Sequence, residues 1–192
     1  MAIAPGKVHL GAARVFFGVT APTTGTPPTL LTHTDGVPGS GNDMGLTEED
    51  CVYHYEDEKK FIEGEQALGY VDVGVVAQRA WVTFTAKEHT YVTLQAAFGN
   101  VGTVTDGSKD LFYFGGGTSV LNPTTGCLVV TARQRNAPTK FIIGILYKAV
   151  YTGGYEVAFN RKKESMFRMR FDGIFLTTRD AGDQLGYYTF ER

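Results

Sequence analysis

The sequence predicts a mainly β protein, and three features lead to that prediction. Glycine accounts for 24 of the 192 residues and is spread along the chain, as many tight turns require. Between the glycines lie short runs rich in Val, Thr, Phe and Tyr, which favour β-strands. Residues 79–87 and 166–176 alternate apolar and polar side chains with the period of two that is typical of a strand. We therefore expect one domain over residues 1–192 in which strands far outnumber helices.

Composition narrows the class of protein. Hydrophobic residues make up 43% of the chain, which is enough to bury a sizeable core. A formal charge of −2 does not produce the basic field with which proteins hold nucleic-acid phosphates. The longest apolar runs, such as residues 141–146, are far shorter than the roughly 20 residues of a membrane helix, so we expect no membrane span. No secretory signal is visible, and Cys51 and Cys127 are expected to be reduced thiols in a cytosol-like compartment.

The first half of the chain begins with a predicted strand over residues 13–19. Residues 20–45 are then expected to form a long extended arm, because their closely spaced prolines cannot donate to a central sheet. A connection of this length usually serves as a functional or partner-binding loop, and a disordered linker is the alternative. Two separate strands over residues 51–57 and 60–66 come next, followed by a strand over 79–87. Residues 90–98 form the one predicted short helix, which Gly99 would end.

Six further strands are expected in the second half, over residues 111–114, 126–134, 140–150, 155–159, 166–176 and 185–190. The strand over 166–176 is the clearest, because Phe167, Met169 and Phe171 alternate with Arg168 and Arg170. This alternation predicts one buried face and one solvated face.

No complete catalytic or metal-binding constellation is present. The serines lack the G-x-S-x-G turn of hydrolases, and the histidines occur singly, without an H-E-x-x-H pair. Cys51 and His54 make half of a metal site at most. The glycines at 115–117 are read as a hairpin turn, and the acidic runs at 48–50 and 56–58 lack the spacing of a calcium loop. We therefore predict no enzyme, no metal and no cofactor, and favour a structural or assembly role.

Four segments follow one another along the chain: GAARVF (11–16), GNDMGLTE (41–48), FIEGEQALG (61–69) and AWVTFTAKE (80–88). In these segments the chain resembles the tail tube (major tail) proteins of long-tailed bacteriophages. In that family a Gly-x-Thr-x-Gly-type turn leads into a strand, a strand with alternating acidic residues ends in a Gln/Ser-Leu-Gly turn, and a further strand feeds a short helix. The order and spacing of the matching segments carry the resemblance, which covers about residues 11–98. Glu49 and Asp50 depart from the small residue expected there, and nothing family-specific follows residue 100.

The resemblance implies a β-sandwich or barrel flanked by the helix, with six copies closing into a ring. The rings would stack into a tube, the conduit for delivery of viral DNA into the host cell. Implied partners are other copies of the chain, the tape measure protein, the tail terminator and distal tail or baseplate proteins, with transient non-specific passage of double-stranded DNA. The implied location is the virion tail, which is assembled in the host cytoplasm.

Three groups of residues take roles in such a tube. A lumen lined by carboxylates repels the duplex and keeps it from sticking, although these residues could equally be ordinary solvated positions or partners of arginines. The arm would reach the next ring, and the basic cluster would pair with acidic edges of a neighbouring subunit, with nucleic-acid contact as the alternative. The lumen candidates are Glu63, Glu65, Glu56, Glu58 and Asp72; the arm candidates are Pro22, Pro27, Pro28, Leu30 and Leu31; the basic candidates are Arg161, Lys162, Lys163, Arg168 and Arg170.

Two other classes of function are kept as alternatives. A related head-tail connector, capsid decoration or baseplate protein would share the composition and the arm. An enzyme would use Glu63 and Glu65, which lie about 7 Å apart on one strand face, within the general range for glycoside chemistry. Nothing else in the sequence supports the enzyme, since the single tryptophan, Trp81, is as readily a core residue as a sugar platform.

Overall fold

A computed structural model of the chain describes residues 7–9, 13–25, 29–45, 47–63, 70–87, 91–98, 103–106, 109–112, 125–135, 137–154 and 166–192. These residues are mainly strands with antiparallel pairing and one short helix, α1 (Tyr91–Phe98), which confirms the predicted class. The strands are β1 (Lys7–His9), β2 (Ala13–Val19), β3 (His33–Thr34), β4 (Val37–Pro38), β5 (Asn42–Asp43), β6 (Thr47–Glu63), β7 (Tyr70–Ala86), β8 (Thr103–Asp106), β9 (Lys109–Phe112), β10 (Thr125–Gln134), β11 (Ala137–Tyr151), β12 (Phe167–Gly173) and β13 (Gly186–Phe190).

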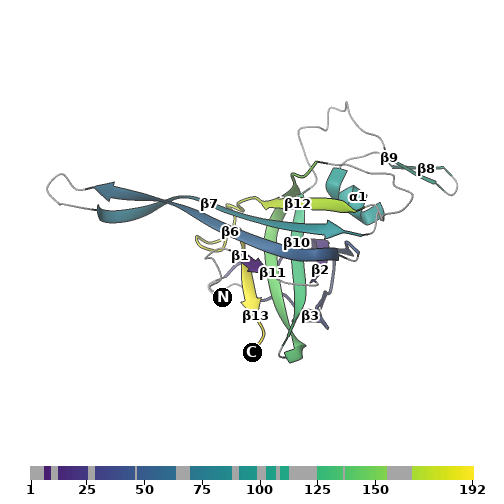
Figure 1. Cartoon of the computed structure of the whole chain (residues 1–192), viewed down its shortest axis with the longest axis horizontal. Helices are drawn as coiled ribbons and strands as arrows, with labels where there is room; N and C mark the ends of the chain where they lie inside the picture. The colour runs from purple at the N-terminus through teal and green to yellow at the C-terminus, as the bar shows by residue number, and fades with distance from the viewer. Residues whose placement is uncertain are drawn as a thin grey trace.

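Nine of the described strands belong to one sheet. Its order is β1-β6-β7-β12-β11-β10-β2-β5, and β13 pairs with β11 beside this path. The path ends at β1 and β5, so the described strands do not close a barrel. In Figure 1, β6, β7 and β12 run across β10 and β11 at a large angle, so the two halves of the sheet face each other.

The main core fills the space between these two halves. Val82 and Phe171 come from the β7–β12 half, whereas Val15, Leu128 and Leu146 come from the other half, and all five are fully buried. A second cluster, which includes Phe16, Val129 and Ile145, lies on the opposite face of β2, β10 and β11. Because both faces of β10 are covered, its middle residues form a continuous buried run instead of an alternating pattern.

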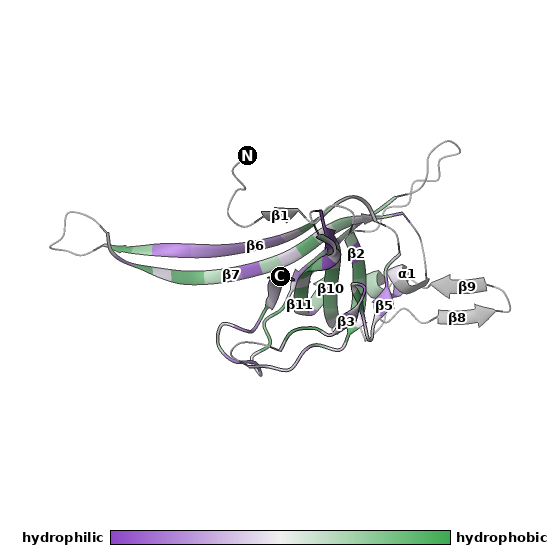
Figure 2. Cartoon of the chain, turned by 90° about the horizontal axis from the view of Figure 1, so that it is seen from below, coloured by the Kyte–Doolittle hydropathy of each residue, from purple (hydrophilic) through white to green (hydrophobic). Residues whose placement is uncertain are grey.

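Strands β6 and β7 extend well beyond this core. Each has 17 residues, and they pair along their whole length as far as Glu63 and Tyr70. Strand β1 pairs with β6 only as far as His54, and β12 pairs with β7 only as far as Trp81. Past these positions, residues 55–63 and 70–80 continue as a two-stranded projection, here called the ribbon, which Figures 1 and 2 show extending far from the rest of the described chain. No described strand pairs with either outer edge of the ribbon.

Most predicted elements match described ones, with one correction in the ribbon. The predicted strand over 51–57 and the described part of the one over 60–66, residues 60–63, belong to a single strand, β6. A register shift between Glu58 and Lys59 absorbs the irregularity between them, so no turn is needed there. Residues 70–78 were not predicted as a strand, because their run of valines around Gly74 lacks clear alternation. The strand expected over 155–159 lies outside the described residues.

The predicted arm also has structure of its own. Strands β3 and β4 form a hairpin whose two turn residues, Asp35 and Gly36, both have positive φ, as a type I′ turn requires. Strand β5 pairs with β2, where Arg14 forms an ion pair with Asp43. Much of the region therefore lies against its own domain. Whether it also contacts a neighbouring ring stays a prediction, and Pro27 and Pro28 lie outside the described residues.

Both cysteines are buried as free thiols, and burial raises the pKa of Cys51 and of Cys127 from 9.0 to about 12. Burial likewise raises the pKa of Tyr188 from 10.0 to about 12. Between about pH 9 and 12 the unfolded chain therefore holds fewer protons than the folded one, and stability falls as the pH rises.

We expect the urea midpoint of unfolding to be lower at pH 10.5 than at pH 8. The matched measurement is thiol labelling, which at pH 8 should be slow in the folded protein and fast in urea, because only unfolding exposes the sulfur atoms. A midpoint that is flat between pH 8 and 10.5, together with rapid labelling of the folded protein, would contradict this prediction.

Candidate functional site

One face of the ribbon carries an apolar stripe that continues the core face of the sheet and is interrupted by the ion pair of Asp57 with Lys59. Paired residues of antiparallel strands point to the same side, and the pair of Tyr53 and Val82 is buried in the core. Farther out on that side, Phe61 pairs with Val73, and Val75 pairs with Lys59. The exposed fractions are 55% for Phe61, 48% for Val73 and 54% for Val75. The stripe thus has the pattern of a buried sheet face but no described layer covers it.

The apolar surface continues at the base of the ribbon. Val75, Val76, Ala77, Gln78 and Phe175 line a shallow groove of about 430 Å³. Val76 is 60% exposed and Phe175, which follows β12, is 42% exposed. Figure 2 shows the green hydrophobic segments of β7 in the ribbon. The exposed apolar side chains therefore form a contiguous region and are not scattered singly, which is typical of an interaction surface.

The opposite face of the ribbon is charged. Register places Glu56 beside Arg79, Glu58 beside Ala77, and Asp72 beside Ile62. These three lumen candidates are all exposed. The cations Lys60 and Arg79 share their face, so the carboxylates do not form a purely acidic wall. The backbone of Glu63 pairs with Tyr70 at the end of the ribbon, whereas the side chain of Glu63 and all of Glu65 lie outside what the structure describes.

Two of the predicted basic residues lie together on the solvated face of β12. Arg168 pairs in register with Thr85 of β7, and Arg170 pairs with Thr83. With Gly153 and Gly154 these residues line an open recess of about 420 Å³. The other members of the cluster, Arg161, Lys162 and Lys163, lie outside the described residues.

The two arginines of this recess differ in their surroundings. The Nη2 and Nε atoms of Arg170 donate to the carboxylate of Asp172 over 2.7 and 3.0 Å, and its guanidinium lies 5.1 Å from the Trp81 ring. Burial acts to raise the pKa of Asp172, but hydrogen bonds from Arg170 and Thr152 outweigh it and hold that pKa below its usual value. Arg168 is exposed and has no ion-pair partner among the described residues.

Trp81 belongs to the same solvated face. Its ring stacks on His54 of the neighbouring strand, with ring centres 4.8 Å apart and planes 8° apart. His54 in turn shares a hydrogen bond of 3.2 Å with the hydroxyl group of Thr83. Trp81 is therefore half-buried on the outer face of the sheet and is not a member of either core cluster.

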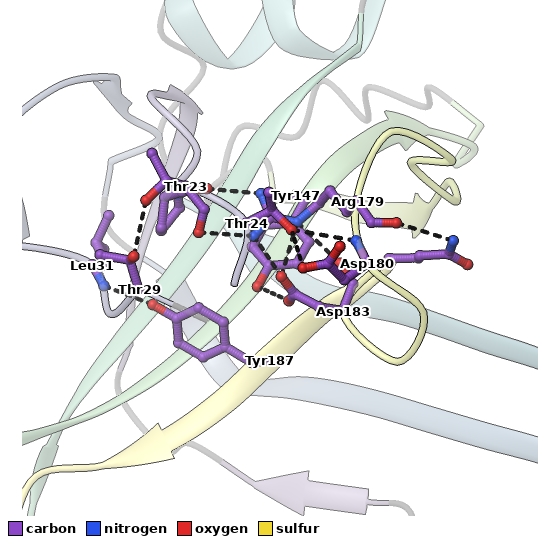
Figure 3. Close-up of polar contacts among 11 residues, drawn as sticks. Thr23, Thr24, Thr29, Leu31, Tyr147, Arg179, Asp180, Asp183 and Tyr187 are labelled. Atoms are coloured by element: carbon purple, nitrogen blue, oxygen red, sulfur yellow. Dashed lines mark hydrogen bonds and ion pairs between the residues drawn. The ribbon is translucent and has the colours of Figure 1, made fainter. Parts of the chain in front are cut away.

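A buried arginine, Arg179, joins Pro22 and Thr23 to the loop that follows β12 (Figure 3). Arg179 donates to the carbonyl oxygens of Pro22 over 2.7 Å and Thr23 over 3.3 Å. Its charge is compensated by Asp183, whose Oδ2 lies 2.8 Å from the Nη2 atom. Both side chains are 7% exposed, so this pair is held away from solvent. One of the predicted arm residues, Pro22, is thus occupied within its own chain.

Two tyrosines take part in the same contact, here called the anchor, which Arg179 and Asp183 form with Pro22 and Thr23. Tyr147 donates a hydrogen bond to Asp183, and its ring centre lies 3.6 Å from the guanidinium carbon of Arg179. Burial, followed by the hydrogen bond to Asp183, raises the pKa of Tyr147 above its usual value. The hydroxyl group of Tyr187 accepts a hydrogen bond of 2.7 Å from the backbone nitrogen of Leu31, whereas Leu30 is 60% exposed. Nothing in the sequence marks Arg179 or Asp183 as buried, because both lie in a loop with no hydrophobic periodicity.

Sites of other kinds are not found in the described part of the chain. It contains no group of three or more His, Cys, Asp or Glu side chains that could hold a metal ion. No helix within it is both long and apolar enough to span a membrane. Comparison with known proteins adds no family, since no protein-family model and no curated protein matches this chain.

Proposed function

We propose that this protein is a structural virion protein, a tail tube subunit that polymerises as stacked hexameric rings around a conduit for viral DNA. In this proposal the subunit is a β-sandwich or barrel that becomes complete only in the assembly. The ribbon is the observation that carries the proposal. An isolated two-stranded hairpin is marginally stable in water, and this one also exposes Phe61, Val73 and Val75 on the face that continues the core.

A second copy of the chain is the partner that best fits this surface. Both outer edges of the ribbon carry backbone groups without a described strand partner, and such edges invite pairing with another strand. One face of the ribbon carries the apolar stripe with the Asp57–Lys59 ion pair within it, whereas the other face is mostly charged, so the two faces suit different neighbours. A tube supplies such neighbours around each ring and between rings. The resemblance of residues 11–98 to tail tube proteins is consistent with this geometry.

The purified protein is expected to form rings or filaments at high concentration, visible by negative-stain electron microscopy. The double variant Phe61→Ser/Val75→Ser should remain in small species. Full burial of such a side chain contributes about 1.5–3 kcal/mol, and because only about half of each is exposed, losing two should raise the assembly concentration at least about tenfold. Sedimentation velocity at matched concentrations measures the difference.

The control is Phe190→Ser, which removes an equally exposed phenylalanine from β13, outside the ribbon. This variant should assemble as the unchanged protein does. A wild-type chain that stays monomeric at every concentration would exclude the tube. A single ring that does not stack would instead support the alternative of a connector, decoration or baseplate protein.

A further inference from the structure

The outer face of β6, β7 and β12 carries more carboxylates than cations at its ribbon end and more cations than carboxylates at its other end. Arg168 and Arg170 alternate along β12 with side chains buried in the main core, so they lie on the outer face. Register continues this face through Thr83 and Trp81 on β7 to His54 on β6. Alternation then places Glu56 and Glu58, farther out on β6, on the same side. Among the described side chains, this face therefore carries Glu56, Glu58 and Asp72 with the cations Lys60 and Arg79 in the ribbon, and Arg168 and Arg170 with Asp172 at its base.

The two charged pairs have the same spacing. Residues two apart on a strand point to one face and lie about 7 Å apart. This holds for Glu56 and Glu58, and equally for Arg168 and Arg170. The spacing of two carboxylates on one strand therefore matches that of two guanidinium groups on another strand, one of which, on Arg170, is already paired with Asp172.

The groups at both ends remain available for such a contact. Glu56 and Glu58 are exposed and have no ion-pair partner among the described residues. Arg168 has none either, and it borders an open recess. Arg170 uses Nε and Nη2 for Asp172, which together with the Trp81 ring holds its guanidinium in place. Its Nη1 group is left to donate to a further acceptor.

The two ends cannot meet within one chain. Arg79, which faces Glu56, and Thr85, which faces Arg168, are six residues apart on the same strand. Six residues of a strand span about 20 Å, far beyond the reach of an ion pair. The ribbon also projects away from β12 in Figure 1. The partner of each end must therefore come from another molecule.

We propose that Glu56 and Glu58 of one copy dock into the recess formed by Arg168 and Arg170 of the next copy. The proposal rests on the proposed self-assembly and names the two surfaces that meet. Because these surfaces are different, the contact is head-to-tail, and such contacts generate rings or filaments. A chain of net charge −2 also offers little attraction to nucleic acid, which makes a carboxylate from another copy the preferred occupant of the recess.

Charge exchange between two variants tests the docking. Glu56→Lys/Glu58→Lys and Arg168→Glu should each raise the critical concentration for assembly at least tenfold. An equimolar mixture of the two should assemble close to the wild-type concentration, because each reversed surface then finds an opposite one. Arg135→Glu is the control, since this exposed arginine lies in the β10–β11 turn at a distance from both surfaces. The neutral variants Glu56→Gln/Glu58→Gln and Arg168→Gln repeat the test with less effect on folding.

The outcomes separate this docking from the proposed function. Variants that assemble as the wild type does would overturn the ionic docking and leave the tube proposal standing. Variants that fail alone and also fail together would overturn the pairing of these two surfaces. A closed dimer as the largest species would overturn the head-to-tail arrangement. A wild-type chain that never assembles would overturn both proposals.

Discussion

Replacing Arg179 with methionine is expected to lower the free energy of unfolding by about 3–5 kcal/mol, the usual cost of removing one partner from a buried ion pair. The variant leaves Asp183 buried without its cation, and the carbonyl oxygens of Pro22 and Thr23 lose their donor. Urea unfolding followed by circular dichroism measures the change, at a concentration below that of assembly. Arg135→Met is the control, and as an exposed substitution it should stay within about 0.5 kcal/mol.

The same variant should loosen residues 20–25 and 29–31 more than the rest of the described fold. Arg179 is the group that joins this segment to the loop after β12, with Tyr187 as the second tie through Leu31. We therefore expect faster amide hydrogen exchange at Leu31. The double variant Arg179→Met/Asp183→Leu should regain part of the lost stability, because it removes the unpaired carboxylate. A single variant within about 1 kcal/mol of wild type would show that the pair is not buried as described.

Phe171→Ala is expected to cost about 3–5 kcal/mol, the range for truncating a fully buried phenylalanine. The ring lies where the two halves of the sheet meet, with ring centres 5.4 Å from Phe17, 6.1 Å from Phe84 and 5.5 Å from Tyr151. Its removal leaves a cavity between strands that do not belong to one local hairpin, so no single element can close it. Urea unfolding again measures the loss.

Phe175→Ala is the matched control for this substitution. It removes the same side chain four residues later, where the ring is 42% exposed. The expected loss is below about 1 kcal/mol in the unassembled protein. Equal losses at the two positions would contradict the described burial of Phe171.

Local patterns predicted the elements that lie within the core. Residues 13–19 match β2, and the alternation of Phe167, Met169 and Phe171 correctly predicted a strand with one solvated face. The helix over 90–98 was found within a residue. The hairpin of β3 and β4 was missed, although Asp35-Gly36 is the dipeptide that favours its turn. The closely spaced prolines around this hairpin led instead to the prediction of an extended arm without secondary structure.

The candidate site was predictable only in part. Arg168 and Arg170 were identified as an exposed basic pair, and Glu56 and Glu58 as exposed acidic residues, because charge and alternation are local properties. The apolar stripe was not predictable from the sequence, because Phe61 and Val73 become neighbours only through the pairing of β6 with β7. The anchor around Arg179 joins residues 156 or 157 positions apart, and no local pattern encodes such a contact.

The sequence by itself determined that this is a mainly β chain, with the faces of its core strands and the signs of its charged clusters. Those properties follow from the period of two and from composition, both of which act over a few residues. Only the tertiary structure decided that β6 and β7 extend beyond the core and that Arg179, in the loop after β12, is buried. How far β6 and β7 extend depends on where their neighbouring strands stop pairing, and the burial of Arg179 depends on which segments pack against its loop. Both are set by contacts between distant parts of the chain, which no local pattern encodes.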